Sequence, residues 1–143
     1  MVGMRVITIM FGLVLVIGAC SMGDAPIDDA AVLSIIKEVA DSIDYLTDDE
    51  LYGVSDYWAS VRETETAGAG DCEDYAILAL SRIYERLGVK GVMLTGHGFN
   101  AGTWHAWIAV GGVEYDPTFG AVAPESYETW LIWNYDVLRG WMA

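Results

Sequence analysis

Two consecutive glycines, Gly111 and Gly112, separate two apolar stretches at 103–110 and 113–116. A Gly-Gly pair between such stretches is a strong signal for a β-hairpin, because both residues can adopt the backbone angles of the favoured two-residue turns. A third apolar stretch, 92–95, has the composition of a strand. The sequence therefore predicts a hairpin with a further strand in the same sheet.

The predicted turn fixes which residues of the two hairpin strands lie opposite one another. If Val110 pairs with Val113, then Trp107 lies opposite Asp116. Side chains alternate along a strand, so His105 shares a face with Trp107. Diagonal neighbours on a sheet are within side-chain reach. We therefore expect His105 to contact Asp116, an expectation that a one-residue shift in register would destroy.

A helix is expected from Cys72, with Asp71 as its N-cap and Gly88 as its end. Cys72 belongs to a stripe of apolar residues along this helix. The other members of the stripe are Tyr75, Ala76, Ala79, Leu80, Ile83 and Leu87. Cys72 is thus expected in the first turn, facing the core. The helix dipole and free amides there favour a thiolate.

Together these residues supply the components of a thiol acyl-transfer site. Cys72 is the candidate nucleophile, His105 the base and Asp116 the group that orients it. A low thiol pKa and a resting ion pair with His105 are expected. The backbone N–H of Cys72 is a candidate oxyanion donor, with the Trp58 indole or the Tyr57 hydroxyl as a second. The alternative for Cys72 is an inert, small apolar residue, and for Trp58 and Tyr57 it is packing.

Other segments are expected to support this site. A helix capped by Asp28 and Asp29 has apolar residues at helical spacing: Val32, Ile35, Ile36, Val39, Ile43 and Leu46. Residues 51–60 are expected to be irregular or a short helix, and 68–70 a flexible lead-in. The aromatic tail 126–143 is expected to cover the core rather than form a lip beside the substrate.

The N-terminal residues have the pattern of an export signal. Arg5 precedes an apolar run that is shorter than the roughly 20 residues of a membrane span. Small residues then lead into Cys20, as in a bacterial lipobox. We expect a signal peptide at 1–20 with lipidation of Cys20, a tether at 21–27 and one domain at 28–143. An ordinary signal peptide or a short anchor is the alternative.

Charge and cysteine content limit the kinds of partner and the disulfides that the chain can have. The 143 residues include 21 Asp and Glu against 7 Lys and Arg. Such a chain repels phosphate backbones and anionic lipid, so no nucleic-acid partner is expected. The two cysteines, Cys20 and Cys72, have separate expected roles, so no disulfide framework is implied. His97, in a Gly-His-Gly sequence, is expected in a surface loop.

At these residues the chain resembles the bacterial transglutaminase-like cysteine proteinases, within the transglutaminase-like and papain-like superfamily. The resemblance covers roughly residues 30–119 and makes this chain a small, lipoprotein-type member. It rests on the following runs: Tyr52-Gly53, Asp56-Tyr57-Trp58-Ala59, Glu63-Thr64, Gly68 to Ala76, His105-Ala106-Trp107 and Tyr115-Asp116-Pro117-Thr118. The ordered combination is specific, whereas a lone Cys-x-x-Asp would not be.

The resemblance implies an α+β fold, in which a helix bearing the nucleophile packs on an antiparallel sheet. It also implies a catalytic triad of Cys72, His105 and Asp116. The best-known members are periplasmic, calcium-dependent proteases in which acidic residues beside the nucleophile hold the ion. The matching positions here are Asp71, Glu73 and Asp74. Their alternative role is favourable electrostatics at a helix start, and calcium needs six or more oxygen ligands.

The expected function is therefore a thiol hydrolase that cleaves peptide or amide bonds of an envelope protein through a thioester. Two alternatives stay open: an amine acyl transferase with the same residues, and a non-catalytic envelope lipoprotein that binds a partner. The chemistry requires no cofactor, and calcium is the ion that the resemblance implies. The expected partners are a protein or peptide substrate in the bacterial cell envelope and, through lipid on Cys20, the membrane.

Overall fold

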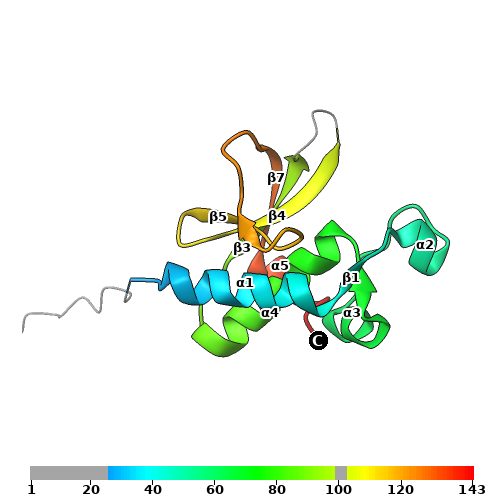
Figure 1. Ribbon diagram of the computed structural model, residues 1–143, viewed down its shortest axis with the longest axis horizontal. Helices are drawn as coiled ribbons and strands as arrows, with labels where there is room; N and C mark the ends of the chain where they lie inside the picture. The colour runs from blue at the N-terminus through cyan, green and yellow to red at the C-terminus, as the bar shows by residue number, and fades with distance from the viewer. Residues whose placement is uncertain (1–25, 99–102) are drawn as a thin grey trace, which may run out of the picture.

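The computed structural model describes residues 26–98 and 103–143, in two packed layers (Figure 1). Helices α1 (Asp29–Ser42) and α4 (Cys72–Leu87) pack against each other and against one face of a five-stranded sheet. The α+β fold expected from the sequence is confirmed. The predicted signal peptide and Cys20 lie outside the described residues.

The sheet is antiparallel throughout, in the order β6-β5-β4-β3-β7. Its strands, in chain order, are β3 (Val92–His97), β4 (Trp104–Val110), β5 (Val113–Asp116), β6 (Ala121–Val122) and β7 (Glu128–Asn134). The hairpin strands β4 and β5 therefore lie inside the sheet, flanked on both sides.

The Gly-Gly hairpin has the predicted register. Val110 pairs with Val113, and both turn glycines have positive φ, 62° at Gly111 and 86° at Gly112. A side chain at either position would be strained. The turn thus fixes which residues of β5 lie beside His105.

Both long helices begin where local signals place them. Asp28 caps α1 by accepting the N–H groups of Ala30 and Ala31, while α4 starts at Cys72 and ends before Gly88, which is left-handed with φ 69°. α1 stops at Ser42, earlier than the apolar pattern through Leu46 suggested. The chain there turns into β1 (Asp44–Tyr45).

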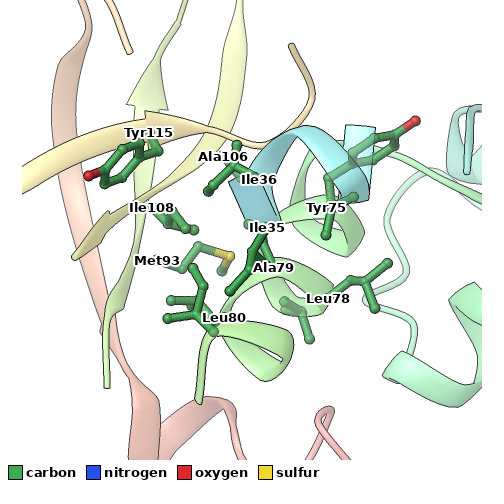
Figure 2. Packing of buried hydrophobic residues seen from close by; sticks show 14 of the residues in the cluster. Ile35, Ile36, Tyr75, Leu78, Ala79, Leu80, Met93, Ala106, Ile108 and Tyr115 are labelled. Carbon is green, nitrogen blue, oxygen red and sulfur yellow. The ribbon is translucent and has the colours of Figure 1, made fainter. Parts of the chain in front are cut away.

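The core lies between the helices and the sheet (Figure 2). Ile36 of α1, Leu80 of α4, Met93 of β3 and Ile108 of β4 are all fully buried. Each such side chain contributes about 1.5–3 kcal/mol on transfer from water. Cys72 belongs to the same cluster. The nucleophile candidate is thereby held by the main core.

The segment before Cys72 is ordered, so the expected flexible lead-in is wrong. Ala69 and Gly70 form the buried strand β2 (Ala69–Gly70), which pairs in parallel with β1. A Cβ on Gly70 would lie 2.6 Å from the Asp74 Cβ. Glycine is required here by close approach to α4, not by flexibility.

Two short helices complete the region before β2. They are α2 (Asp48–Tyr52), which ends at the left-handed Gly53, and α3 (Val61–Ala67), which Ser60 caps in a reciprocal arrangement with Glu63. The expectation of irregular structure with a short helix is confirmed in outline.

The C-terminal tail covers part of the core, as expected, but it does so as a strand and a short helix rather than as one helix. It forms the edge strand β7 followed by the short helix α5 (Tyr135–Leu138). Trp130 and Ile132 of β7 are 54% and 66% exposed, whereas Trp133 and Trp141 pack against the core. Within 26–98 and 103–143, no helix has the length and apolar character to cross a membrane.

Candidate active site

Cys72 lies at the start of α4 and is 7% exposed. Its thiol donates a hydrogen bond to Glu73 Oε2 at 3.0 Å. The backbone N–H of Ala106, in β4, lies near the same sulfur and favours its ionised form. The sulfur is therefore held at the junction of the helix and the sheet.

A cleft of about 490 Å³ opens beside this sulfur. Four aromatic residues and three carboxylates line it together with Cys72: Tyr45, Trp58, Trp104 and Trp133, and Asp56, Asp71 and Glu73. Trp133 comes from β7, so the tail contributes a wall of the cleft. The tail therefore covers part of the core, as expected, and also lines the cleft, which is the alternative role.

His105 and Asp116 form the contact that the hairpin register predicted. His105 Nε2 lies 2.8 Å from Asp116 Oδ2, and the two side chains are 3% and 1% exposed. Asp116 also receives the Thr118 N–H on Oδ1 at 3.0 Å and the Tyr127 hydroxyl on Oδ2 at 2.7 Å. Sequence reasoning missed Tyr127, because it lies in an irregular stretch before β7 where no periodicity assigns it a neighbour.

Strand β4 links Cys72 and its cleft to the His105–Asp116 pair. Ala106, whose N–H reaches Cys72, directly follows His105. The side chain of Ala106 belongs to the main core, and alternation directs His105 and Trp107 to the other face of the strand. On that face His105 stacks on Trp107, with ring centroids 6.2 Å apart. Gly98 lies against the His105 ring so closely that a Cβ would be 2.4 Å from the His105 Cβ.

The environment of Cys72 raises its thiol pKa. Burial is the main cause, followed by the nearby carboxylate of Glu73, which also accepts a hydrogen bond from the thiol, and by Asp71. The expected low pKa and resting ion pair are thus not what the structure contains. A helix N-terminus carries only about half a positive charge, which two carboxylates and burial outweigh.

The acidic residues expected to bind a cation are close together. Three groups of potential ligand atoms each lie within 4.8 Å of one another: Asp71, Cys72 and Glu73; Asp48, Asp71 and Asp74; and Asp48, Asp56 and Glu73. In the described part of the chain, Asp48 Oδ1, Asp71 Oδ1 and Asp74 Oδ2 are buried without a hydrogen-bond partner. Asp48, which belongs to α2, and Asp56, in the irregular segment that follows, are members that the sequence did not reveal as ligands.

Burial and mutual repulsion raise the pKa values of these carboxyls. The pKa of Asp71 rises to about 9, because of burial and then Glu73, Asp48 and Asp74. That of Asp74 rises to about 7, chiefly through burial and despite the hydrogen bond from the Ala59 N–H at 2.9 Å. Unpaired, crowded carboxylates are the environment that a bound cation would relieve.

Of the two side chains considered as oxyanion donors, only one lies in the cleft. Trp58 lines the cleft and packs edge-on against Trp133, with ring centroids 5.0 Å apart. The Tyr57 hydroxyl instead donates to Glu63 at 3.0 Å, and Tyr57 is not part of the cleft lining. His97 was expected in a loop but ends β3, where its Nδ1 lies 3.8 Å from Glu128.

The fold is α+β, with Cys72 at a helix start and a buried His105–Asp116 pair reached through the neighbouring strand, as in transglutaminase-like proteins. The family model for bacterial transglutaminase-like cysteine proteinases matches residues 23–110. That is more than half of the chain, which therefore belongs to this family of cysteine peptidases. The matched residues include Cys72 and His105, and Asp116 lies beyond them.

A solved structure gives a second comparison. The chain is similar to a candidate cysteine protease from Cytophaga hutchinsonii, with a TM-score of 0.49 and 20% sequence identity, over 75% of this chain and 44% of that one. This chain thus spans less than half the length of that protein. No curated protein matches.

Proposed function

We propose that the chain is a thiol hydrolase that cleaves peptide or amide bonds through a triad of Cys72, His105 and Asp116. The observation that carries this proposal is the position of the Cys72 sulfur, in a cleft and at the backbone of the residue that follows His105. The His105 ring is in turn bound to a buried carboxylate at 2.8 Å. Family membership supports the same chemistry.

In the proposed mechanism His105 is the base. Because Nε2 faces Asp116, Nδ1 would take the Cys72 proton, which has to pass from the core face of β4 to the face that holds the imidazole. The thiolate attacks the carbonyl carbon, and the Cys72 N–H with the Trp58 indole would stabilise the oxyanion. The imidazolium then protonates the departing amine, leaving a thioester. Water, deprotonated by His105, hydrolyses the thioester and restores the thiol.

The acidic residues would hold a calcium ion beside the nucleophile. Asp71, Glu73 and Asp74, joined by Asp48, offer carboxylate oxygens, three of them buried and unpaired within the described residues. When bound, the ion would supply positive charge that offsets the carboxylates. Glu73 would then be less effective at retaining the thiol proton. Calcium would thereby activate the thiol without taking part in bond cleavage.

The proposed setting is the bacterial cell envelope. The support is the sequence pattern of residues 1–20, with its lipobox-like end at Cys20, and the seven-residue tether that follows. A fully extended tether of that length reaches roughly 20 Å. The substrate would therefore be a protein or peptide close to the membrane surface.

The test is to trap the acyl-enzyme. We would incubate the chain, starting after Cys20, with a mixture of short peptides and calcium, stop the reaction with acid, and measure the intact protein mass. A peptide adduct on Cys72, absent in Cys72→Ser and followed by free peptide acid, is the expected result. Added methylamine would separate the alternatives, since an acyl transferase yields the methylamide. Neither adduct nor product with any peptide, together with an unreactive thiol, would contradict the proposal.

A further inference from the structure

We infer that Tyr127 is a positioning residue of the proposed triad, acting on His105 through Asp116. This inference rests on the proposed function of His105 and Asp116, and adds a fourth member to their hydrogen-bonded group. Tyr127 lies just before β7, outside residues 23–110 that the family model matches.

The geometry at Asp116 carries the inference. A single oxygen, Oδ2, faces both His105 Nε2 at 2.8 Å and the Tyr127 hydroxyl at 2.7 Å. The other oxygen accepts the Thr118 N–H at 3.0 Å. The carboxylate is 1% exposed and held from three directions, so it has no freedom to turn away from the imidazole.

The ring of Tyr127 also contacts both aromatic groups of this face. It stands edge-on to the His105 ring, with centroids 5.6 Å apart and an angle of 89° between the ring planes. It also stands edge-on to the Trp107 ring, with a centroid distance of 5.0 Å and an interplanar angle of 72°. The hydroxyl and the ring therefore have separable roles. The ring packs beside the imidazole, and the hydroxyl draws charge from Asp116.

The direction of the electronic effect follows from the shared oxygen. A hydrogen bond from Tyr127 stabilises the ionised form of Asp116 and weakens its attraction for a proton or an imidazolium. Without that bond, Oδ2 would interact more strongly with protonated His105. Tyr127 thus shares the charge of Asp116 with His105 and weakens the attraction of that carboxylate for a protonated imidazole.

The elements that neighbour β4 carry ionisable groups whose effect on His105 must be separated from that of Tyr127 in the test. They are Asp116 and Glu114 from β5, Cys72 from α4, and the His97–Glu128 pair where β3 meets β7. Tyr127→Phe removes one oxygen, and among these groups only Asp116 loses a hydrogen bond. Tyr115→Phe is the matched control, since it removes a tyrosine hydroxyl that also donates to a carboxylate, Asp29, at 3.2 Å.

The experiment is an NMR titration of the two histidine rings in the chain that starts after Cys20, with His97→Gln used for assignment. We expect the midpoint of His105 to rise in Tyr127→Phe by about half a unit or more and to stay unchanged in Tyr115→Phe. If a peptide substrate is cleaved, kcat should fall roughly 10-fold with KM unchanged. An unchanged or lowered midpoint would overturn the inference.

This readout is independent of the proposed hydrolysis. A shifted midpoint in a chain that cleaves nothing would leave the hydrogen bond established and the hydrolase proposal rejected. If Tyr127→Phe does not fold, the wild-type protein still gives a test. The Tyr127 ring carbons should then show no ionisation up to pH 11, and ionisation at the ordinary pKa of about 10 would overturn the inference.

Discussion

At the scale of single residues, Cys72 is held in its protonated form by its neighbours. Its thiol is buried and donates to Glu73 at 3.0 Å, so the proton is retained where a nucleophile would lose it. Nucleophilic activation therefore has to overcome a carboxylate next to the sulfur. This makes Glu73 the side chain whose charge should control the reactivity of the thiol.

Replacing Glu73 tests that control. In Glu73→Gln the thiol loses the nearest negative charge, so its pKa falls and more thiolate is present at neutral pH. Alkylation of Cys72 by iodoacetamide in calcium-free buffer at pH 7 should become roughly 10-fold faster. Glu85→Gln, an exposed acid on the same helix, is the control and should leave the rate unchanged. Equal rates in all three proteins would contradict the interpretation.

Replacing Asp116 tests the orienting role. Asp116→Asn keeps the shape but removes the charge that faces His105 Nε2 at 2.8 Å. The imidazolium loses its stabilising partner, so peptide hydrolysis should fall on the order of 10³-fold. Asp136→Asn, which affects only the surface pair with Lys90, should be near wild-type. A hydrolysis rate in Asp116→Asn within a few-fold of wild-type would exclude Asp116 from the triad.

At the scale of elements, the start of α4 depends on how closely β2 approaches it. Gly70 lies so near Asp74 that no side chain fits between them, and Asp74 ties the helix to the segment at Ala59. The position of Cys72 is therefore set by the preceding strand as well as by the helix cap. A displacement there would move the sulfur relative to β4.

Gly70→Ala tests this close contact. The added Cβ would lie 2.6 Å from the Asp74 Cβ, so the helix start must shift, at a cost of about 1–3 kcal/mol in the free energy of unfolding. Gly140→Ala is the control, because nothing lies within 4 Å of its Cβ. Urea unfolding measures both variants. Equal urea midpoints for the two variants would mean that Gly70 and Asp74 pack less closely than the structure indicates.

Sequence signals predicted some elements to the residue and missed others. α4 was predicted at its observed start and end, because Asp71 and Gly88 are local boundary signals, and the hairpin followed from Gly111 and Gly112. β7 was not predicted, because its apolar residues do not alternate and several are exposed. Asp48 and Tyr127 reach the site only through tertiary folding, which no local pattern encodes.

At the scale of the whole molecule, an acidic chain folds around a buried carboxylate cluster. Among the described residues, Asp48, Asp71 and Asp74 carry unpaired buried oxygens. A buried acid whose pKa is raised on folding stabilises the protein when protonated and destabilises it when ionised. The cluster thereby links global stability to both pH and cations.

The raised pKa of Asp74 predicts how stability changes with pH. Asp74 titrates near pH 4 when unfolded and at about 7 in the folded chain. The folded state therefore binds more protons between these values, and calcium-free stability should fall as the pH rises from about 5 to 8. Excess calcium should reverse the trend, and Asp74→Asn should weaken both effects. Thermal unfolding at several pH values, with EDTA or calcium, measures this; a Tm that rises with pH in EDTA would contradict it.

The most direct test of the proposed triad is the iodoacetamide alkylation rate of Cys72 against pH, in calcium and in EDTA. Wild-type, His105→Gln and, as a control, His97→Gln would be compared in the chain that starts after Cys20. With calcium we expect fast alkylation near pH 6 in wild-type and in His97→Gln, and a collapse in His105→Gln. Slow alkylation that follows an ordinary thiol titration at a pKa of about 8.5, unchanged by the His105 substitution in either buffer, would show that Cys72 and His105 do not act together.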